Sequence, residues 1–410
     1  MAVPCAWMGA GRATRSLARS LAPDSFAGSE PSRYRRGMND VVLLREIATA
    51  SGHRFGHATL NQPASLNALT LPMVDALQGA LDRWAADPGV VGVVLDGAGD
   101  KAFCAGGDVV ALLHAIRATP AGEVPRLASD FFAHEYRLDH AIHAYPKPLL
   151  CWGHGHVLGG GLGLLAGASH RVVTPRSRLA MPEIPLGLFP DVGGSWFLRR
   201  LPGRAGLFIG LTAAPLNAAD ARFAGLADVV LPHEQHAAVL SDVAAMAWSA
   251  DAAKNGARLS HLLERHSVEL PPESSNLRRH FELIDSVIGH DSLDEIAVRL
   301  AELAEHPEPW IASAASRFIE GSPTSAALAH ALWQRVPRLG LADVLRIEYD
   351  VAVACCMHHD FAEGVRALLL DKDRRPRWQP ASLAEVDAAL VAAHFVPRRT
   401  GSHPLADLRD

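Results

Sequence analysis

The stretch Lys101-Ala-Phe-Cys-Ala-Gly-Gly-Asp108 decides the fold, because it joins a buried strand to a helix. The apolar run at 91–95 is typical of that strand, and apolar residues continue at helical spacing after Asp108. A second strand, at 149–152, leads through Gly159-Gly160-Gly161 into another apolar helix. Strands that alternate with helices in this way predict an α/β fold.

The same alternation extends from residue 41 to about residue 231. Helices are expected at 71–85 and 131–143, and Pro88 and Pro146 stop them. Strands are expected at 41–47, 54–60, 90–95, 149–152, 171–174 and 227–231.

Beyond Pro232 the strand pattern almost vanishes. We predict a linker at 260–276, where two prolines and mixed charge interrupt the helical pattern. The last third of the chain is otherwise predicted to be helical. Its amphipathic segments are 234–250, 293–304, 324–334 and 341–357.

The chain divides into three predicted segments. Residues 1–37 carry six arginines and no acid before Asp24, a composition that resembles an organellar transit peptide. The alternative is that translation begins at Met38 and that the preceding segment is disordered or never made. Residues 38–232 form the predicted strand-rich core, and 233–410 form a helical region that packs on it.

Composition limits the partners and the compartment. The 410 residues carry a net charge of −5, which gives no support for a nucleic-acid surface or a polybasic membrane patch. No apolar run reaches the roughly 18 to 20 residues that a membrane span needs. The five cysteines lack paired spacing, which favours a reducing compartment. We expect a cytoplasmic protein, or a mitochondrial one if residues 1–37 act as a transit peptide.

The two glycine-rich turns offer exposed backbone N–H groups at the ends of strands. Two such amides that converge on one point would form an oxyanion hole for a carbonyl group. Alternatively, the glycines only permit tight turns and close helix packing. No complete GxGxxG follows a strand in the required context, and no GK[ST] is present, so nucleotide binding is not predicted.

Two carboxylates lie among apolar and proline residues in the segment from Leu179 to Ser195. Glu183 and Asp191 have few charged neighbours in sequence, and an apolar pocket raises the pKa of a carboxylate toward the range useful for acid–base catalysis. The alternatives are that Glu183 caps a turn and that Asp191 is the N-cap of a helix beginning near Gly193. Both roles stay open for Asp191.

Three further polar residues are weaker candidates. From its pattern alone, Glu135 is an exposed residue of the helix at 131–143. His154 and His156 are spaced so that they could share a face as metal ligands, but no third ligand recurs at a usable spacing. No metal site is predicted.

Taken jointly, five segments resemble the crotonase (enoyl-CoA hydratase/isomerase) superfamily, and most closely its 3-hydroxyisobutyryl-CoA hydrolase branch. The resemblance is strong over 41–231 and looser through the helical region. The segments are Thr59-Leu-Asn-Gln-Pro-Ala-Ser-Leu-Asn-Ala-Leu69, Lys101 to Asp108, Phe131-Phe-Ala-His-Glu-Tyr136, Leu158-Gly-Gly-Gly-Leu-Gly163, and Ala180-Met-Pro-Glu183 through Phe189-Pro-Asp-Val-Gly-Gly194.

This resemblance implies a crotonase-like spiral of ββα units as the catalytic core. It implies that Gly107 and Gly160 supply the oxyanion-hole amides, that Lys101 lies near the rim of the coenzyme A site, and that Glu183 is the catalytic glutamate. In the hydrolase branch, Glu135, Gly160, Glu183 and Asp191 occupy substrate-contacting or catalytic positions. The implied partner is an acyl-CoA substrate with no further cofactor, and the helical region is a candidate subunit interface of a homo-oligomer.

One departure separates the branches of the family. Enoyl-CoA hydratases carry a second catalytic glutamate two residues after the glycine triplet, where this chain has Gly163. Hydratases also usually have a non-acidic residue where Asp191 stands. The resemblance therefore predicts hydrolysis of a short-chain 3-hydroxyacyl-CoA. Glu183 would attack the carbonyl or activate water. A lyase or isomerase of the same fold and a non-catalytic acyl-CoA-binding protein are the alternatives.

Overall fold

The computed structural model describes residues 40–289 and 292–410. The predicted segment 1–37 lies outside the described residues. Six strands form one sheet in which the first pair is antiparallel and every other neighbouring pair is parallel. In spatial order they are β1 (Val42–Ala48), β2 (Arg54–Leu60), β3 (Val90–Gly97), β5 (Leu149–Gly153), β7 (His170–Val173) and β9 (Val229–Val230). All six expected strands are confirmed, with shifts of one or two residues at several ends.

A second, three-stranded parallel sheet was not predicted. It consists of β4 (Ala102–Cys104), β6 (His156–Leu158) and β8 (Arg178–Ala180). Each strand has only three residues, too few for a period-two pattern to be visible in the sequence. Each short strand follows a long strand of the large sheet, and α2 (Val109–Ala118) and α4 (Gly160–Gly167) follow β4 and β6. This is the repeated ββα order that the resemblance implies.

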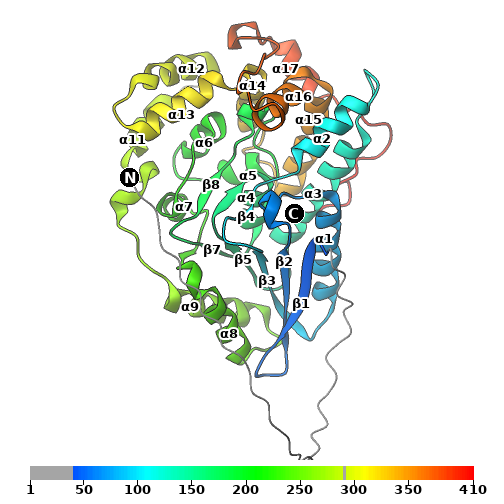
Figure 1. The fold of residues 1–410 in the computed structure, drawn as a ribbon, viewed down its shortest axis with the longest axis vertical. Helices are drawn as coiled ribbons and strands as arrows, with labels where there is room; N and C mark the ends of the chain where they lie inside the picture. The colour runs from blue at the N-terminus through cyan, green and yellow to red at the C-terminus, as the bar shows by residue number, and fades with distance from the viewer. Residues whose placement is uncertain (1–39, 290–291) are drawn as a thin grey trace, which may run out of the picture. The chain divides into compact units, whose positions relative to one another are not determined.

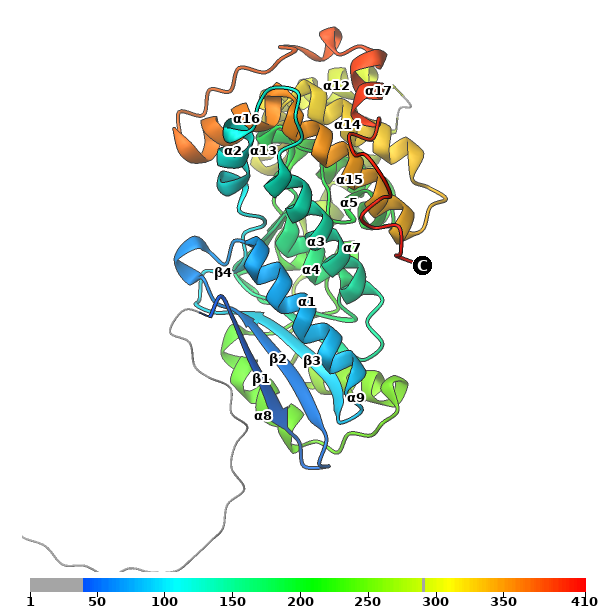
Figure 2. The same cartoon turned by 90° about the vertical axis from the view of Figure 1, so that its right-hand side faces the viewer.

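Helices cover both faces of the central strands of the large sheet (Figures 1 and 2). Its side chains alternate between two cores, so that Val93 packs in the core on the side of α1 (Leu71–Ala86), while Val94 packs in the opposite core. Leu259, on α9 (Ala252–His266), belongs to that opposite core. The predicted linker at 260–276 is therefore wrong in its first part, because 260–266 is the end of this amphipathic helix.

Beyond Val230 the described residues contain helices and turns but no strand, as predicted. Two helices of this region matter for the site: α13 (Pro309–Glu320) and α15 (Leu341–Met357). The long helix α3 (Arg126–His143) packs against α15, so the helical region contacts the strand-rich core directly (Figure 2). Among helices within 40–289 and 292–410, none has both the length and the apolar character needed to cross a membrane.

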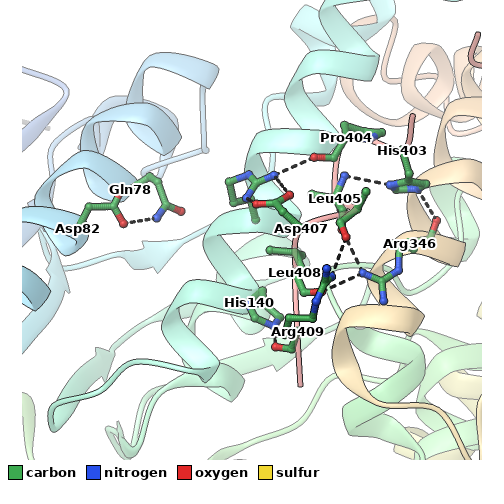
Figure 3. A network of polar contacts seen from close by, with 12 residues as sticks. Gln78, Asp82, His140, Arg346, His403, Pro404, Leu405, Asp407, Leu408 and Arg409 are labelled. Carbon is green, nitrogen blue, oxygen red and sulfur yellow. Dashed lines mark hydrogen bonds and ion pairs between the residues drawn. The ribbon is translucent and has the colours of Figure 1, made fainter. Parts of the chain in front are cut away.

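The last eight residues, 403–410, lie along α3 and α15 (Figure 3). Arg137 of α3 forms an ion pair with Asp407 at 2.7 Å, and His140 lies 2.8 Å from the carbonyl oxygen of Arg409. Arg346 of α15 donates to the carbonyl oxygen of Leu405. The tail thus fixes the outer side of α3, the helix that carries Glu135.

Candidate active site

A pocket of about 470 Å³ lies where the glycine turns, α3 and the segment after β8 meet. Its wall is largely apolar, and its charged lining residues among those described are three acids and Arg317 of α13. Five of the site residues predicted from the sequence line this pocket, and Lys101 does not. The five are Gly107, Glu135, Gly160, Glu183 and Asp191.

The two glycine turns approach each other closely. A Cβ atom built on Gly106 would lie 3.6 Å from the backbone nitrogen of Gly160. Gly160 is the first residue of α4, so its N–H has no acceptor within the helix. The N–H of Gly107 donates no backbone hydrogen bond within the described residues. Both amides are therefore available to an oxygen atom in the pocket.

Glycine is sterically required at these turns. Gly106 and Gly159 have φ angles of +92° and +48°, in the region that side chains disfavour. A Cβ atom on Gly160 would lie 2.4 Å from Oε1 of Glu135, and one on Gly159 would lie 2.7 Å from Oε1 of Glu183. The same glycines that expose the amides leave room for the two carboxyl groups. The tight-turn interpretation and the oxyanion-hole interpretation are compatible here.

Glu183 follows β8 and stands at the start of the short helix η2 (Ile184–Leu186). Its side chain is 4 % exposed, and Oε2 has no hydrogen-bond partner among the described residues. Burial raises the pKa of Glu183 well above its ordinary value, and the nearby charge of Asp191 raises it further. The turn-capping alternative is wrong, because no hydrogen bond in the described chain runs from the helix to this side chain. A buried carboxylate with a raised pKa is a stronger base than an exposed one.

Asp191 is held by a hydrogen bond from another helix. The hydroxyl of Tyr136, on α3, donates to Oδ2 of Asp191 at 2.7 Å. Burial raises the pKa of Asp191 to about 6, while this hydrogen bond opposes the rise. The N-cap alternative is wrong: α5 (Gly194–Leu198) begins after Gly193, and the Asp191 side chain does not cap it in the part of the chain described.

Glu135 is not the exposed residue that its pattern predicts. Its side chain is 2 % exposed because the face of α3 that carries it packs toward the glycine turns. Burial, and then the charge of Asp191, raises the pKa of Glu135 well above its ordinary value. Only the family resemblance placed this residue in the site. Helical periodicity alone does not reveal that a charged residue faces inward.

Gly163 is enclosed by two side chains. A Cβ atom there would lie 2.8 Å from Cβ of Val192 and 3.1 Å from Oδ1 of Asp139. The volume in which a second glutamate would begin is therefore already occupied. Asp139 itself is buried, and neither of its carboxyl oxygens has a hydrogen-bond partner within 40–289 and 292–410. Burial and the charge of Glu135 raise its pKa well above the ordinary value.

Lys101 and the histidine pair lie apart from the pocket. Lys101 is exposed and is not among the described residues that line the pocket. Its carbonyl oxygen accepts the N–H of His156, and His154 lies 2.7 Å from the carbonyl oxygen of Gly99. No cluster of described residues has the composition of a metal site.

Sequence reasoning missed two residues that hold the site together. Tyr136 is the neighbour of Glu135 in sequence, but the residue to which it donates a hydrogen bond, Asp191, lies 55 residues away in the chain. Glu348 of α15 is fully buried and accepts hydrogen bonds from the backbone of Gly193 and Ser195. Burial, and then the charge of Asp191, raises the pKa of Glu348 to about 8. In sequence, Glu348 looks like any glutamate of an amphipathic helix.

Known proteins resemble the chain over most of its length. The pattern of the enoyl-CoA hydratase/isomerase family matches residues 55–395. The chain is 35% identical to 3-hydroxyisobutyryl-CoA hydrolase, mitochondrial, of Gallus gallus, over 87% of this chain and 89% of the relative. It is also 35% identical to the Homo sapiens protein of the same name, over 89% and 90% of the two chains.

Two solved structures share the fold at a similar identity. A carnitinyl-CoA dehydratase from Mycobacterium thermoresistibile has a TM-score of 0.77 and 36% identity, over 88% of this chain and 97% of that one. An enoyl-CoA hydratase from Rhodobacter sphaeroides 2.4.1 has a TM-score of 0.75 and 35% identity, over 88% and 98%. The names of these structures and of the curated relatives describe different reactions on CoA thioesters.

Proposed function

Because the chain belongs to the enoyl-CoA hydratase/isomerase family, we propose that it hydrolyses 3-hydroxyisobutyryl-CoA to 3-hydroxyisobutyrate and coenzyme A. The relatives from Gallus gallus and Homo sapiens carry the name of that hydrolase. The observation that carries the choice is the position two residues after the glycine triplet: Glu183 lies beside the glycine turns, but Gly163, enclosed by Val192 and Asp139, leaves no room there for a second glutamate. One base suffices to deprotonate an attacking water molecule, whereas hydration of a double bond must handle both water and the α-proton.

In the proposed reaction, the thioester oxygen lies between the amides of Gly107 and Gly160. A water oxygen forms a bond to the carbonyl carbon while Glu183 accepts a proton from that water. The negative charge on the carbonyl oxygen is held by the two N–H donors, and losing one such donor typically costs about 3 to 4 kcal/mol of transition-state stabilisation. The carbon–sulfur bond then breaks, and the sulfur leaves as a thiolate that takes up a proton.

Direct attack by Glu183 is the second route that the geometry permits. A carboxylate oxygen would bond to the carbonyl carbon, the thiolate would leave, and water would cleave the resulting anhydride. Acid quenching during the first turnover, followed by mass spectrometry of the peptide that contains Glu183, distinguishes the routes. An acyl adduct on this peptide supports direct attack, whereas its absence during turnover supports attack by water.

Glu135 and Asp191 face the pocket beside the reacting carbonyl. We assign them to the 3-hydroxyl group of the substrate, with Asp191 also able to orient the attacking water. A buried carboxyl group that lacks a partner gains a hydrogen bond when a hydroxyl group arrives. The chemistry draws only on protein groups, water and the coenzyme A of the substrate.

Thiol release from 3-hydroxyisobutyryl-CoA tests the proposal, with crotonyl-CoA assayed in parallel. We expect wild-type protein to release thiol, Glu183→Gln to lose at least about a hundredfold of the rate, and the exposed Glu234→Gln to match wild type. No thiol release, together with loss of the enoyl absorbance of crotonyl-CoA, would instead establish a hydratase. Ligand binding with neither change would establish a non-catalytic acyl-CoA-binding protein.

The curated relatives are named as mitochondrial proteins, which favours the mitochondrial alternative for this chain over the cytoplasm. We therefore propose that residues 1–37 act as a transit peptide. Import of a reporter fused to these residues, compared with a fusion whose six arginines are replaced by glutamine, tests this role. A homo-oligomer formed through 233–410 is a further proposal, tested by the solution mass of the protein.

A further inference from the structure

We propose that Glu348 is a positioning residue for Asp191, and this inference rests on the function proposed above. Glu348 belongs to α15, in the helical region, and lies more than 150 residues from Asp191 in the sequence. Its side chain does not line the pocket, among the residues described, so it acts on the reaction through the turn that carries Asp191.

Both carboxyl oxygens of Glu348 bind the same turn. Oε2 accepts the N–H of Gly193 at 2.7 Å, and Oε1 accepts the N–H of Ser195 at 2.9 Å. The exposed fraction of Glu348 is 0 %, so water does not compete for these two donors. A carboxyl group held through both oxygens fixes the backbone in direction as well as in position.

The turn needs such an external anchor because its local conformation is unfavourable. Val192 has a φ of +52°, a region that β-branched residues rarely adopt because it is strained, and Gly193 follows with +79°. The N–H of Gly194 donates a hydrogen bond to the carbonyl oxygen of Asp191. A strained conformation persists only when its surroundings enforce it. Glu348 supplies two of the enforcing contacts.

Asp191 is thereby fixed from two sides. Tyr136 of α3 holds its side chain through the 2.7 Å hydrogen bond to Oδ2, and Glu348 of α15 holds the backbone just after it. Because α3 and α15 pack against each other, the two anchors share one rigid support. The helical region therefore contributes to the geometry of the active site and does not merely cover the core.

A double-mutant cycle between Glu348 and Asp191 tests this inference. Glu348→Gln keeps the volume and one acceptor oxygen but replaces the second acceptor by an NH₂ group that cannot accept the N–H it faces. We expect kcat to fall about 10- to 100-fold in the wild-type background, as for a displacement of about 1 Å. In the Asp191→Asn background, the same change should cost less than about threefold, because the residue that it positions is already disabled.

Glu348→Ala and Asp343→Asn complete the experiment. Glu348→Gln should retain part of the activity that Glu348→Ala loses. Asp343 is an exposed acid on the same helix, so Asp343→Asn should match wild type in kcat and Tm. If Glu348→Ala does not fold, the double-mutant cycle is complete with Glu348→Gln, which is the only Glu348 variant that it needs.

Equal fold-losses from Glu348→Gln in both backgrounds, or no loss in either, would overturn the positioning role. An Asp191→Asn variant as active as wild type, or a wild type that releases no thiol, would instead show that the proposed function has failed.

Discussion

Tyr136 donates a 2.7 Å hydrogen bond to Asp191, and this bond links the helix that carries Glu135 to the turn that follows Glu183. It supplies a neutral donor to Asp191, which lines a pocket whose charged side chains, among the described residues, are three acids and Arg317. Burial raises the pKa values of Glu135, Glu183 and Asp191, and the charge of Asp191 raises those of the two glutamates further. The Tyr136 hydroxyl instead stabilises the ionised form of Asp191. The balance between these effects sets the pH range in which the site works.

Tyr136→Phe should move the acidic limb of the pH–rate profile upward. The hydrogen bond from Tyr136 holds the pKa of Asp191 down to about 6 against the effect of burial, so removing the donor raises that pKa further. If the ionised form of Asp191 is required, activity is then lost at a higher pH as the medium is acidified. Measuring kcat/KM from pH 5 to 9 for both proteins checks this, and superimposable profiles would contradict it.

Asp191→Asn should stabilise the folded protein at alkaline pH while reducing its activity. The pKa of Asp191 rises from 3.8 to about 6 on folding, so its favourable contribution is present below pH 3.8 and is lost as the pH rises through 6. Asparagine carries no charge, so it avoids the cost of burying the ionised carboxylate, and it still accepts the Tyr136 hydrogen bond.

Urea unfolding at pH 8 and at pH 4 measures this difference. The variant should have a larger free energy of unfolding than wild type at pH 8, and this difference between the two proteins should be smaller at pH 4. The exposed Asp343→Asn substitution should produce no comparable gap at either pH. A variant less stable than wild type at pH 8 would show that the ionised carboxylate is better compensated than its burial indicates.

Gly163→Ala should destabilise the protein and lower kcat. Its Cβ atom would meet Val192 at 2.8 Å, and overpacking of this kind typically costs about 1 to 3 kcal/mol. Because Val192 directly follows Asp191, a displacement of Val192 also moves Asp191 in the active site. Gly79→Ala is a matched control in α1, where the nearest atom beyond the helix backbone is the end of the Arg83 side chain. There alanine should be neutral or stabilising, and equal effects at both glycines would contradict this explanation.

The long elements of the fold were predictable from their apolar residues. The central strands β3 and β5 are short, continuous apolar runs, and α15, whose observed bounds of Leu341–Met357 match the expected 341–357, repeats apolar residues at helical spacing. The short strands β4, β6 and β8 could not be predicted, because three residues carry no period and these strands exist only by pairing with one another. Yet these strands deliver the glycine turns and Glu183 to the pocket.

The residues of the site also fall into those that the sequence pattern identifies and those that it does not. Glycines after strands and carboxylates among prolines are visible in the sequence, so the region of Gly160, Glu183 and Asp191 could be identified from residues. The burial of Glu135 and Glu348 depends on which helix faces pack together across long sequence separations, and local patterns do not encode it. For Glu135 the family resemblance supplied this information. For Glu348 only the three-dimensional structure does.

Arg366→Ala should raise KM for the acyl-CoA substrate with little change in kcat. Arg366 begins the short helix η6 (Arg366–Leu370), whose Leu368 and Leu369 line the pocket. Its guanidinium binds both carboxyl oxygens of Glu363 at 2.8 Å and also contacts Asp371 and Asp373 at 2.7 Å, which closes this segment on itself. Without the guanidinium, three acids repel one another and the leucines lose their fixed position.

The two leucines are apolar residues of the pocket wall, and their side chains carry no group that could take part in bond breaking. They therefore stabilise the bound substrate and the transition state about equally, and their loss weakens binding while leaving the chemical step intact. We expect KM to rise about 3- to 10-fold with kcat within twofold of wild type. Arg366→Lys should fall in between, because an ammonium group keeps the charge but cannot form the bidentate contact with Glu363. Arg258→Ala, an exposed arginine of α9, should leave both constants unchanged. A fall in kcat alone would mean that this segment shapes the transition state rather than the binding of the substrate.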